Sequence, residues 1–190
     1  MTYLQGQKHE EEDLHIMEGR GNITAISQIF DWKKFSRDVI ESYGSLESPD
    51  YSFVNAYLAG AKHPGVRQFL EENYDFSEDT DPNTDVSYGY VLRGAAEDSV
   101  FRVSLVGPYY YLSSLSPDGS QQLPSLDLPS DDDRRLLLKR MEEMGMIFTP
   151  AEVLSKRLVF GNQSSSLYSI LYCYEGEPSW IEGWKTGHLS

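Results

Sequence analysis

The side chains with the clearest capacity for chemistry lie between residues 71 and 85, where seven carboxylates occur without a basic residue. A segment of this kind repels nucleic acid and anionic membranes, and it attracts basic proteins through long-range electrostatics. We therefore expect a basic protein as the partner, and neither nucleic acid nor membrane as a ligand. The seven residues are Glu71, Glu72, Asp75, Glu78, Asp79, Asp81 and Asp85.

Part of this segment, DTDPNTD at residues 79–85, resembles the start of a calcium-binding loop, because oxygen ligands at alternate positions suit that ion. The later positions depart from the pattern. Thr84 stands where the loop needs glycine, and Tyr90 stands where it needs a bidentate glutamate. We expect a solvated acidic loop without a metal. The sequence also lacks a phosphate-binding glycine loop and a dinucleotide fingerprint, so we expect no cofactor.

Other reactive side chains occur in settings that do not favour catalysis. His63 precedes Pro64 at a predicted helix start and has the chemistry of a general base, but no nucleophile motif accompanies it. Cys173 lies among apolar residues, so we expect a buried structural thiol. Glu175 and Glu177 are typical of a solvated strand end. We therefore predict no enzyme, and an enzyme with an unrecognised site near His63 remains an alternative.

Tyrosine is abundant in this chain: there are thirteen, and eight fall in predicted strands. Packing is one interpretation, because tyrosine suits a half-buried pleated surface. A contact face is the other, because tyrosine gives a large contact area at a low entropic cost. Tyr88 and Tyr90 follow the acidic segment directly. They are our candidates for the aromatic centre of a partner-binding surface with an acidic rim.

Hydrophobic periodicity predicts the elements that position these side chains. Apolar residues at three- and four-residue spacing predict a helix over 24–43, with Ile40 on its apolar face and Lys34 on its polar face. Alternation of apolar and polar residues predicts an antiparallel hairpin over 86–105. We further expect helices over 51–60, from Pro64, over 130–145 and from Thr149, and strands over 109–115, 159–160 and 168–174.

These elements predict one α+β domain over residues 23–190, with a mainly antiparallel sheet and helices packed on one face. The helices near 24–43 and 130–145 are expected to share that face. The strand over 168–174 is expected to be central, because both of its faces are apolar. Residues 1–22 are polar and aperiodic and predict a flexible N-terminal arm.

The composition is that of a soluble acidic protein. The chain has 190 residues, a formal net charge of −14 and 13% aromatic residues, which is too many aromatics for a disordered acidic chain. Its single cysteine excludes an internal disulfide. Neither the apolar core of a signal peptide nor a run long enough for a membrane helix occurs, so we predict a cytoplasmic location. The oligomeric state is left open.

Two stretches of the C-terminal half resemble bacterial immunity proteins of polymorphic and contact-dependent toxin systems. They are FRVSLVGPY at residues 101–109 and YSILYCYEGEPSW at residues 168–180. The resemblance implies a small, acidic, cytoplasmic α+β protein that binds and blocks a cognate toxin domain, often a basic nuclease. It carries no individual binding residue over to this chain.

The function predicted from these observations is protein binding through an acidic surface that contains tyrosine, most concretely neutralisation of a basic toxin domain. A chaperone or adaptor for a basic or secreted protein is the first alternative. The second alternative is the enzyme near His63.

Overall fold

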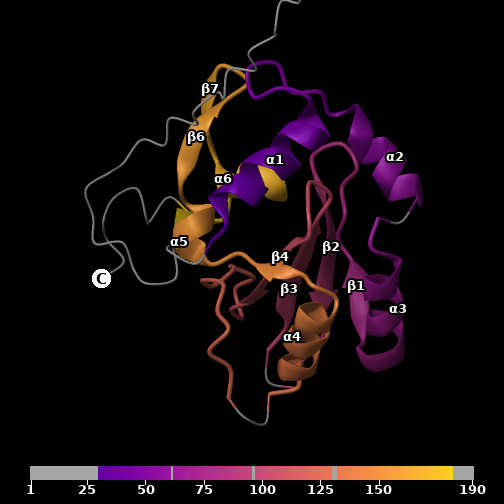
Figure 1. Ribbon diagram of the computed structural model, residues 1–190. Coiled ribbons are helices and arrows are strands. Elements are labelled where there is room, and N and C mark those ends of the chain that lie inside the picture. The colour runs from indigo at the N-terminus through magenta and orange to yellow at the C-terminus, as the bar shows by residue number, and fades with distance from the viewer. Residues whose placement is uncertain (1–29, 61, 96, 130–131, 182–190) are drawn as a thin grey trace, which may run out of the picture.

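The larger sheet of this protein has five strands. The computed structural model of the protein describes residues 30–60, 62–95, 97–129 and 132–181 (Figure 1). The predicted arm over 1–22 and the start of the predicted first helix, 24–29, lie outside these residues. The strands are β1 (Phe76–Glu78), β2 (Ser87–Leu92), β3 (Ser99–Ser104), β4 (Tyr109–Ser114), β5 (Ile147–Phe148), β6 (Arg157–Phe160) and β7 (Gln163–Ser166).

The strand order is β1-β2-β3-β4-β5, and β6 and β7 form a second, two-stranded sheet. All pairs are antiparallel except β4 with β5, which is parallel. The predicted hairpin is confirmed as β2 paired with β3, from Ser87 opposite Ser104 to Leu92 opposite Ser99. The prediction of a single α+β domain with a mainly antiparallel sheet is thus confirmed.

The helices are α1 (Trp32–Tyr43), α2 (Ser52–Gly60), α3 (Pro64–Asn73), α4 (Arg134–Glu143), α5 (Ala151–Leu154) and α6 (Leu167–Leu171).

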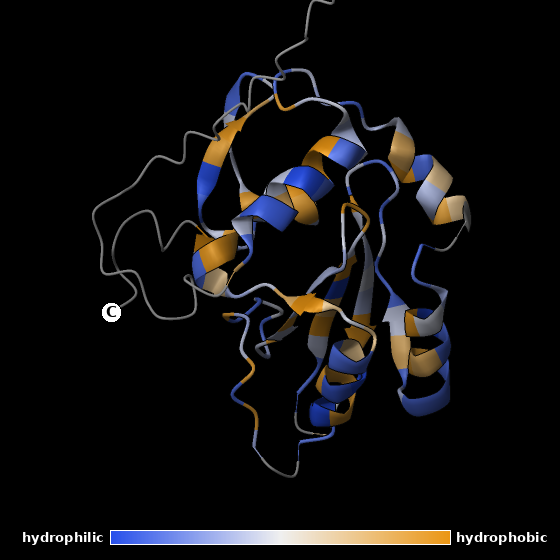
Figure 2. Cartoon of the chain, in the orientation of Figure 1, coloured by the Kyte–Doolittle hydropathy of each residue, from blue (hydrophilic) through white to orange (hydrophobic). Residues whose placement is uncertain are grey.

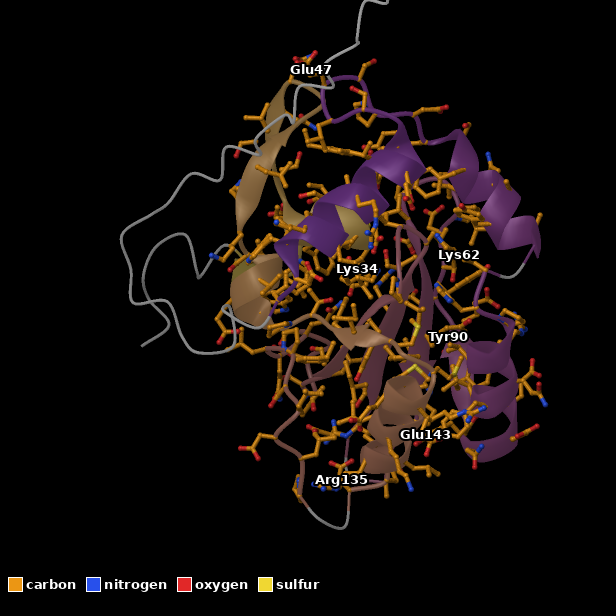
Figure 3. The ribbon with its side chains drawn as sticks, viewed as in Figure 1. Lys34, Glu47, Lys62, Tyr90, Arg135 and Glu143 are labelled. Atoms are coloured by element: carbon orange, nitrogen blue, oxygen red, sulfur yellow. The ribbon has the colours of Figure 1, made fainter. Side chains whose placement is uncertain are left out.

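One aromatic ring from each strand of the larger sheet contributes to a ladder. The rings are those of Phe76, Tyr90, Phe101, Tyr110 and Phe148, with neighbouring ring centroids 5.5–6.1 Å apart. Aromatic contacts of this kind add to the stabilisation from buried apolar area. Tyr90 is 2% exposed and lies in the sheet near α3 (Figure 3). Packing is therefore the role of the tyrosines in this ladder.

Helices cover both faces of this sheet. Those on the ladder's face are α3 and α4, whereas α1, α5 and α6 pack on the opposite face around Tyr109 and Tyr111. The prediction that the helices near 24–43 and 130–145 share one face is therefore wrong. Every position of β3 is buried, so both faces of the sheet are covered. Figure 2 shows hydrophilic residues beside hydrophobic ones on α1, α3 and α4, as expected of amphipathic covering helices.

The bounds of α1 follow from local chemistry. The side chain of Asp31 accepts a hydrogen bond of 2.9 Å from the backbone N–H of Lys34 and so caps the first turn. Gly44 ends the helix with a φ of 74°, which a glycine adopts without strain. Phe35 is 1% exposed and faces the sheet, but Ile40 is 43% exposed, so its predicted place on the apolar face is wrong.

The predicted central strand over 168–174 is wrong in its first half, which forms the short helix α6. The Ser166 side chain caps that helix by accepting a hydrogen bond of 3.0 Å from the backbone N–H of Ser169. A short run that is apolar on all sides does not distinguish a buried helical turn from a central strand. Beyond α6 the chain pairs with residues 84–86: Tyr172 accepts from the N–H of Val86 at 2.9 Å.

Candidate functional site

The acidic segment, residues 71–85, runs from the end of α3 through β1 into the loop before β2 (Figure 1). The sequence shows no counter-charge within it, but an arginine from the preceding helical turn supplies one. Arg67 pairs with Glu71 at 3.0 Å and with Glu78 at 2.9 Å, all three being exposed. Glu72 and Asp75 are also exposed. Glu72 accepts a hydrogen bond of 2.9 Å from Gln68.

Arg102, on β3, is the buried counter-charge of the acidic loop, residues 79–85. Its Nη1 lies 2.7 Å from the Asp85 carboxylate, and its Nη2 lies 3.4 Å from that of Asp79. Asp85 is 3% exposed. The prediction that Asp85 contacts a partner directly is therefore corrected to a structural role. Only the folded hairpin brings Arg102 to this loop, so the local run of charge gave no signal of it.

The acidic loop is held in one shape by its own hydrogen bonds. Gly89 donates its N–H to the Thr80 hydroxyl at 2.9 Å, and its carbonyl accepts from the N–H of Asp79 at 2.8 Å. A Cβ at Gly89 would lie 2.4 Å from the Asp79 carbonyl oxygen, so only glycine fits. The Asp81 carboxylate accepts from the backbone N–H and the side-chain amide of Asn83 at 2.9 and 3.0 Å. These carboxylates serve the loop itself, and the described residues offer no group of three or more ligands suited to a metal ion.

The two tyrosines predicted for the contact surface do not form one. Tyr90 is 2% exposed within the aromatic ladder, so its predicted contact role is wrong. Tyr88 is half-buried, and its hydroxyl donates to the Tyr57 carbonyl at 2.7 Å and accepts from the backbone N–H of Lys62 at 3.1 Å. Both residues therefore hold the sheet together, Tyr90 by packing and Tyr88 by tying β2 to the end of α2.

Two other tyrosines lie exposed beside the acidic loop. Tyr51 is 37% exposed and Tyr174 is 44% exposed, and their rings meet edge to face with centroids 5.6 Å apart. The Tyr174 hydroxyl donates to the Asn83 carbonyl, and its backbone N–H donates to the Thr84 carbonyl at 3.1 Å. We call Tyr51, Tyr174 and the loop residues 81–83 the tyrosine surface.

A hollow lies on each side of the tyrosine pair, and both tyrosines line both hollows. The larger, of about 390 Å³, lies between α2 and the acidic loop. The smaller, of about 230 Å³, lies against β6, β7 and α6 and is mostly polar. The larger is lined by Tyr51, Val54, Asn55, Pro82, Asn83, Asp85, Val86 and Tyr174. The smaller is lined by Tyr51, Arg157, Phe160, Gln163, Ser164, Ser165, Ser169, Ile170, Tyr174 and Glu177.

The charge around the tyrosine surface is negative. Asp50, Asp81 and Glu175 are exposed carboxylates that flank the two rings from three segments. Hydrogen bonds from Ser52 lower the pKa of Asp50, so this carboxylate is ionised at neutral pH. Burial and the neighbouring Tyr174 raise the pKa of Tyr51, so its phenol is neutral. The surface therefore presents aromatic rings within an anionic rim.

His63 does not have the surroundings of a general base. It lines a third hollow, of about 250 Å³, with Arg67, Glu78 and Tyr88 among its neighbours. Burial lowers the pKa of His63, and its Nε2 lies 3.1 Å from the Ser104 carbonyl, to which it donates when neutral. Glu78, which is the one carboxylate among the described residues that line this hollow, is paired with Arg67. No convergent set of acid, base and nucleophile forms here among the described residues.

Cys173 is buried at 7% exposure beside Asp85, with which it forms an isolated antiparallel bridge. Burial and the Asp85 carboxylate raise the pKa of the Cys173 thiol to about 11. A thiol with such a pKa is protonated at neutral pH and is a poor nucleophile. The geometry therefore gives Cys173 a packing role.

None of the described helices combines the length and the apolar character that crossing a bilayer requires. The functional argument rests on the geometry of the tyrosine surface, because a comparison of the chain with protein-family models, curated proteins and solved structures found no match.

Proposed function

We propose that this protein binds a basic protein through the tyrosine surface. One observation carries the proposal: Tyr51 and Tyr174 are the described tyrosines with exposed rings, and they lie side by side next to the acidic loop. Tyrosine is enriched at the centres of interfaces, where a rigid aromatic ring fills a pocket on the partner. The two exposed rings keep apolar surface in contact with water, and a partner that covered both rings would remove this unfavourable exposure.

The charge around the rings indicates the kind of partner that would bind. Asp50, Asp81 and Glu175 form an anionic rim, and the chain as a whole has a formal net charge of −14. An anionic surface speeds the encounter with a basic protein and disfavours acidic competitors. The hydrogen bonds within the acidic loop fix Asp81 in place, so little order has to be created there on binding.

The partner class that we propose is a toxin domain, which this protein would block. An inhibitor of this kind needs an exposed surface that binds the toxin and needs no catalytic group of its own, and the tyrosine surface is an exposed surface of this kind. An enzyme at His63 has less support, because the ring is engaged by the Ser104 carbonyl and Glu78 is engaged by Arg67.

Capture followed by a growth assay tests the proposal. The wild-type protein and a double variant, Tyr51→Ser with Tyr174→Ser, are immobilised and exposed to a host extract. Leu123→Ser with Leu136→Ser is the matched control, because these exposed side chains line neither hollow beside the tyrosines. We expect one basic protein that the wild type and the control retain and the tyrosine variant loses.

Each captured candidate is then expressed alone and together with this protein. A toxin arrests growth alone, and coexpression of the wild type restores growth better than coexpression of the tyrosine variant does. Equal retention by all three proteins would refute binding through the tyrosine surface. A captured partner that leaves growth unchanged would refute the toxin assignment.

A further inference from the structure

The larger hollow beside the tyrosine pair is lined by residues that suit one extended cationic side chain. We infer that it receives an arginine side chain of the basic partner. This inference rests on the proposed function and names the chemistry by which the same surface recognises its partner.

The walls of the hollow suit the planar face and the aliphatic stem of arginine. Tyr51 and Tyr174 supply aromatic rings, and Val54 and Val86 supply aliphatic surface. A guanidinium group stacks on aromatic faces and is attracted by their π electrons. A volume of about 390 Å³ accommodates a single long side chain but not a folded element.

The polar atoms of the hollow suit a donor rather than an acceptor. Asn55 and Asn83 contribute amides with acceptor oxygens, and the Asp85 carboxylate, which is bonded to Arg102, lies in the wall and acts through its negative charge. Among the residues that the structure describes, no lysine, arginine or histidine lines this hollow. A guanidinium presents five N–H donors and no acceptor, which matches such a lining.

The charge count of the acidic loop leaves room for a second cation. The loop carries three carboxylates, on Asp79, Asp81 and Asp85, and one guanidinium, that of Arg102, pairs with the first and the last. Three negative charges and one positive charge leave a net charge of −2. Because Asp85 is 3% exposed, its field is less screened by water than that of a surface carboxylate.

Arginine fits this site better than lysine. The ammonium group of lysine is compact and strongly hydrated, so stripping its water costs more in a hollow lined largely by apolar groups. The guanidinium is more weakly hydrated and gains from stacking on an aromatic face. We therefore expect the affinity order arginine, then lysine, then citrulline, the last being the neutral analogue of arginine with nearly the same shape.

Three peptide probes test the inference on the full chain. They are acetyl-Gly-Arg-Gly-amide, its lysine analogue and its citrulline analogue, titrated into protein labelled with ¹³C at tyrosine. We expect saturable chemical-shift changes at Tyr51 and Tyr174 with the arginine peptide. We expect its affinity to exceed that of the citrulline peptide by about fivefold, which corresponds to about 1 kcal/mol.

A variant pair locates the binding. Asn55 is exposed on α2 and lines the hollow, whereas Asn73 is exposed at the end of α3 and lies outside it. Asn55→Arg places a cation from the protein itself into the hollow and should abolish the shift changes. Asn73→Arg adds the same charge elsewhere and should leave them nearly unchanged. Equal shifts with arginine and citrulline, persistence of the shifts in Asn55→Arg, or no saturable shift would each overturn the inference.

The two proposals fail separately. If the arginine peptide does not bind but the tyrosine double variant loses the captured partner, the arginine site is wrong and the proposed function stands. If the arginine peptide binds as expected but the double variant keeps the captured partner, the proposed function is wrong and the arginine site stands.

Discussion

Arg102 ties the acidic loop to the sheet. Its guanidinium bonds to Asp85 at 2.7 Å, and the two residues are 8% and 3% exposed. Its Nε has no hydrogen-bond partner within the described part of the chain. A buried ion pair adds little net stability compared with an apolar pair, but removal of one member leaves the other as an uncompensated buried charge. The attachment of the loop to the sheet thus depends on this arginine.

We predict that Arg102→Met lowers the free energy of unfolding by about 3–5 kcal/mol, because Asp85 is left buried without its counter-charge. The double variant Arg102→Met with Asp85→Asn should recover part of that loss, because the buried charge is gone. Urea denaturation at neutral pH measures both. A loss below about 1 kcal/mol in the single variant, or no recovery in the double variant, would contradict the role of the pair.

His63 gives a second prediction at the scale of one residue. Burial lowers its pKa from the usual value of 6.5, so the unfolded chain takes up a proton first as the pH falls. Stability from the neutral ring is therefore present above about pH 6.5 and is lost as the pH falls toward the folded-state pKa. We expect the free energy of unfolding to fall less between pH 7.5 and 5.5 in His63→Gln than in the wild type, because glutamine does not titrate. Glutamine also keeps a donor for the Ser104 carbonyl. The same fall in both proteins would show that His63 is not the titrating group.

At the scale of elements, periodic patterns predicted most of the fold. The hairpin of β2 and β3 was predictable because its residues alternate over both strands. The helix α6 was not, because the apolar run over 168–174 has no period that separates a helical turn from a central strand. The placement of helices on both faces was also missed, although the apolar residues at odd and even positions of β3 and β4 indicate a sheet that is buried on both sides.

The candidate site was predictable only in its local part. The acidic loop is contiguous in sequence and was identified from it. The tyrosine pair was not, because Tyr51 and Tyr174 meet only when residues 172–174 bond to residues 84–86. Tertiary contacts also supply the counter-charge, Arg102, which no local pattern indicates.

The helix α1 provides a prediction at this scale. Phe35 is 1% exposed in the core, so Phe35→Ala should lower the free energy of unfolding by about 3–5 kcal/mol. Lys33 is exposed, and Lys33→Ala should change it by less than about 0.5 kcal/mol. Lys34, predicted for the polar face, pairs with Asp38, whose side chain is 10% exposed. Lys34→Ala should therefore fall between the other two variants in chemical denaturation. Equal losses at Phe35 and Lys33 would contradict the assigned face of the helix.

For the whole molecule, the distribution of charge should govern the rate of association with a basic partner. Asp75→Asn with Asp81→Asn removes two exposed charges of the acidic segment. Asp118→Asn with Asp127→Asn removes two exposed charges that lie outside the acidic segment. Stopped-flow mixing at low salt should show a decrease in the association rate constant of about two- to fivefold for the first pair and a smaller decrease for the second. Both decreases should shrink as salt is added. Equal decreases would mean that only the net charge matters.

The most direct test of the account is the dissociation constant of the captured basic partner for three proteins: the wild type, Tyr51→Ser with Tyr174→Ser, and Leu123→Ser with Leu136→Ser. Two central aromatic anchors that each contribute about 1.4 kcal/mol predict an affinity about a hundredfold weaker for the tyrosine variant. The leucine variant should bind within about twofold of the wild type, because its altered residues lie outside the tyrosine surface. Calorimetric titration measures all three. An unchanged dissociation constant in the folded tyrosine variant would contradict the claim that Tyr51 and Tyr174 form the binding surface.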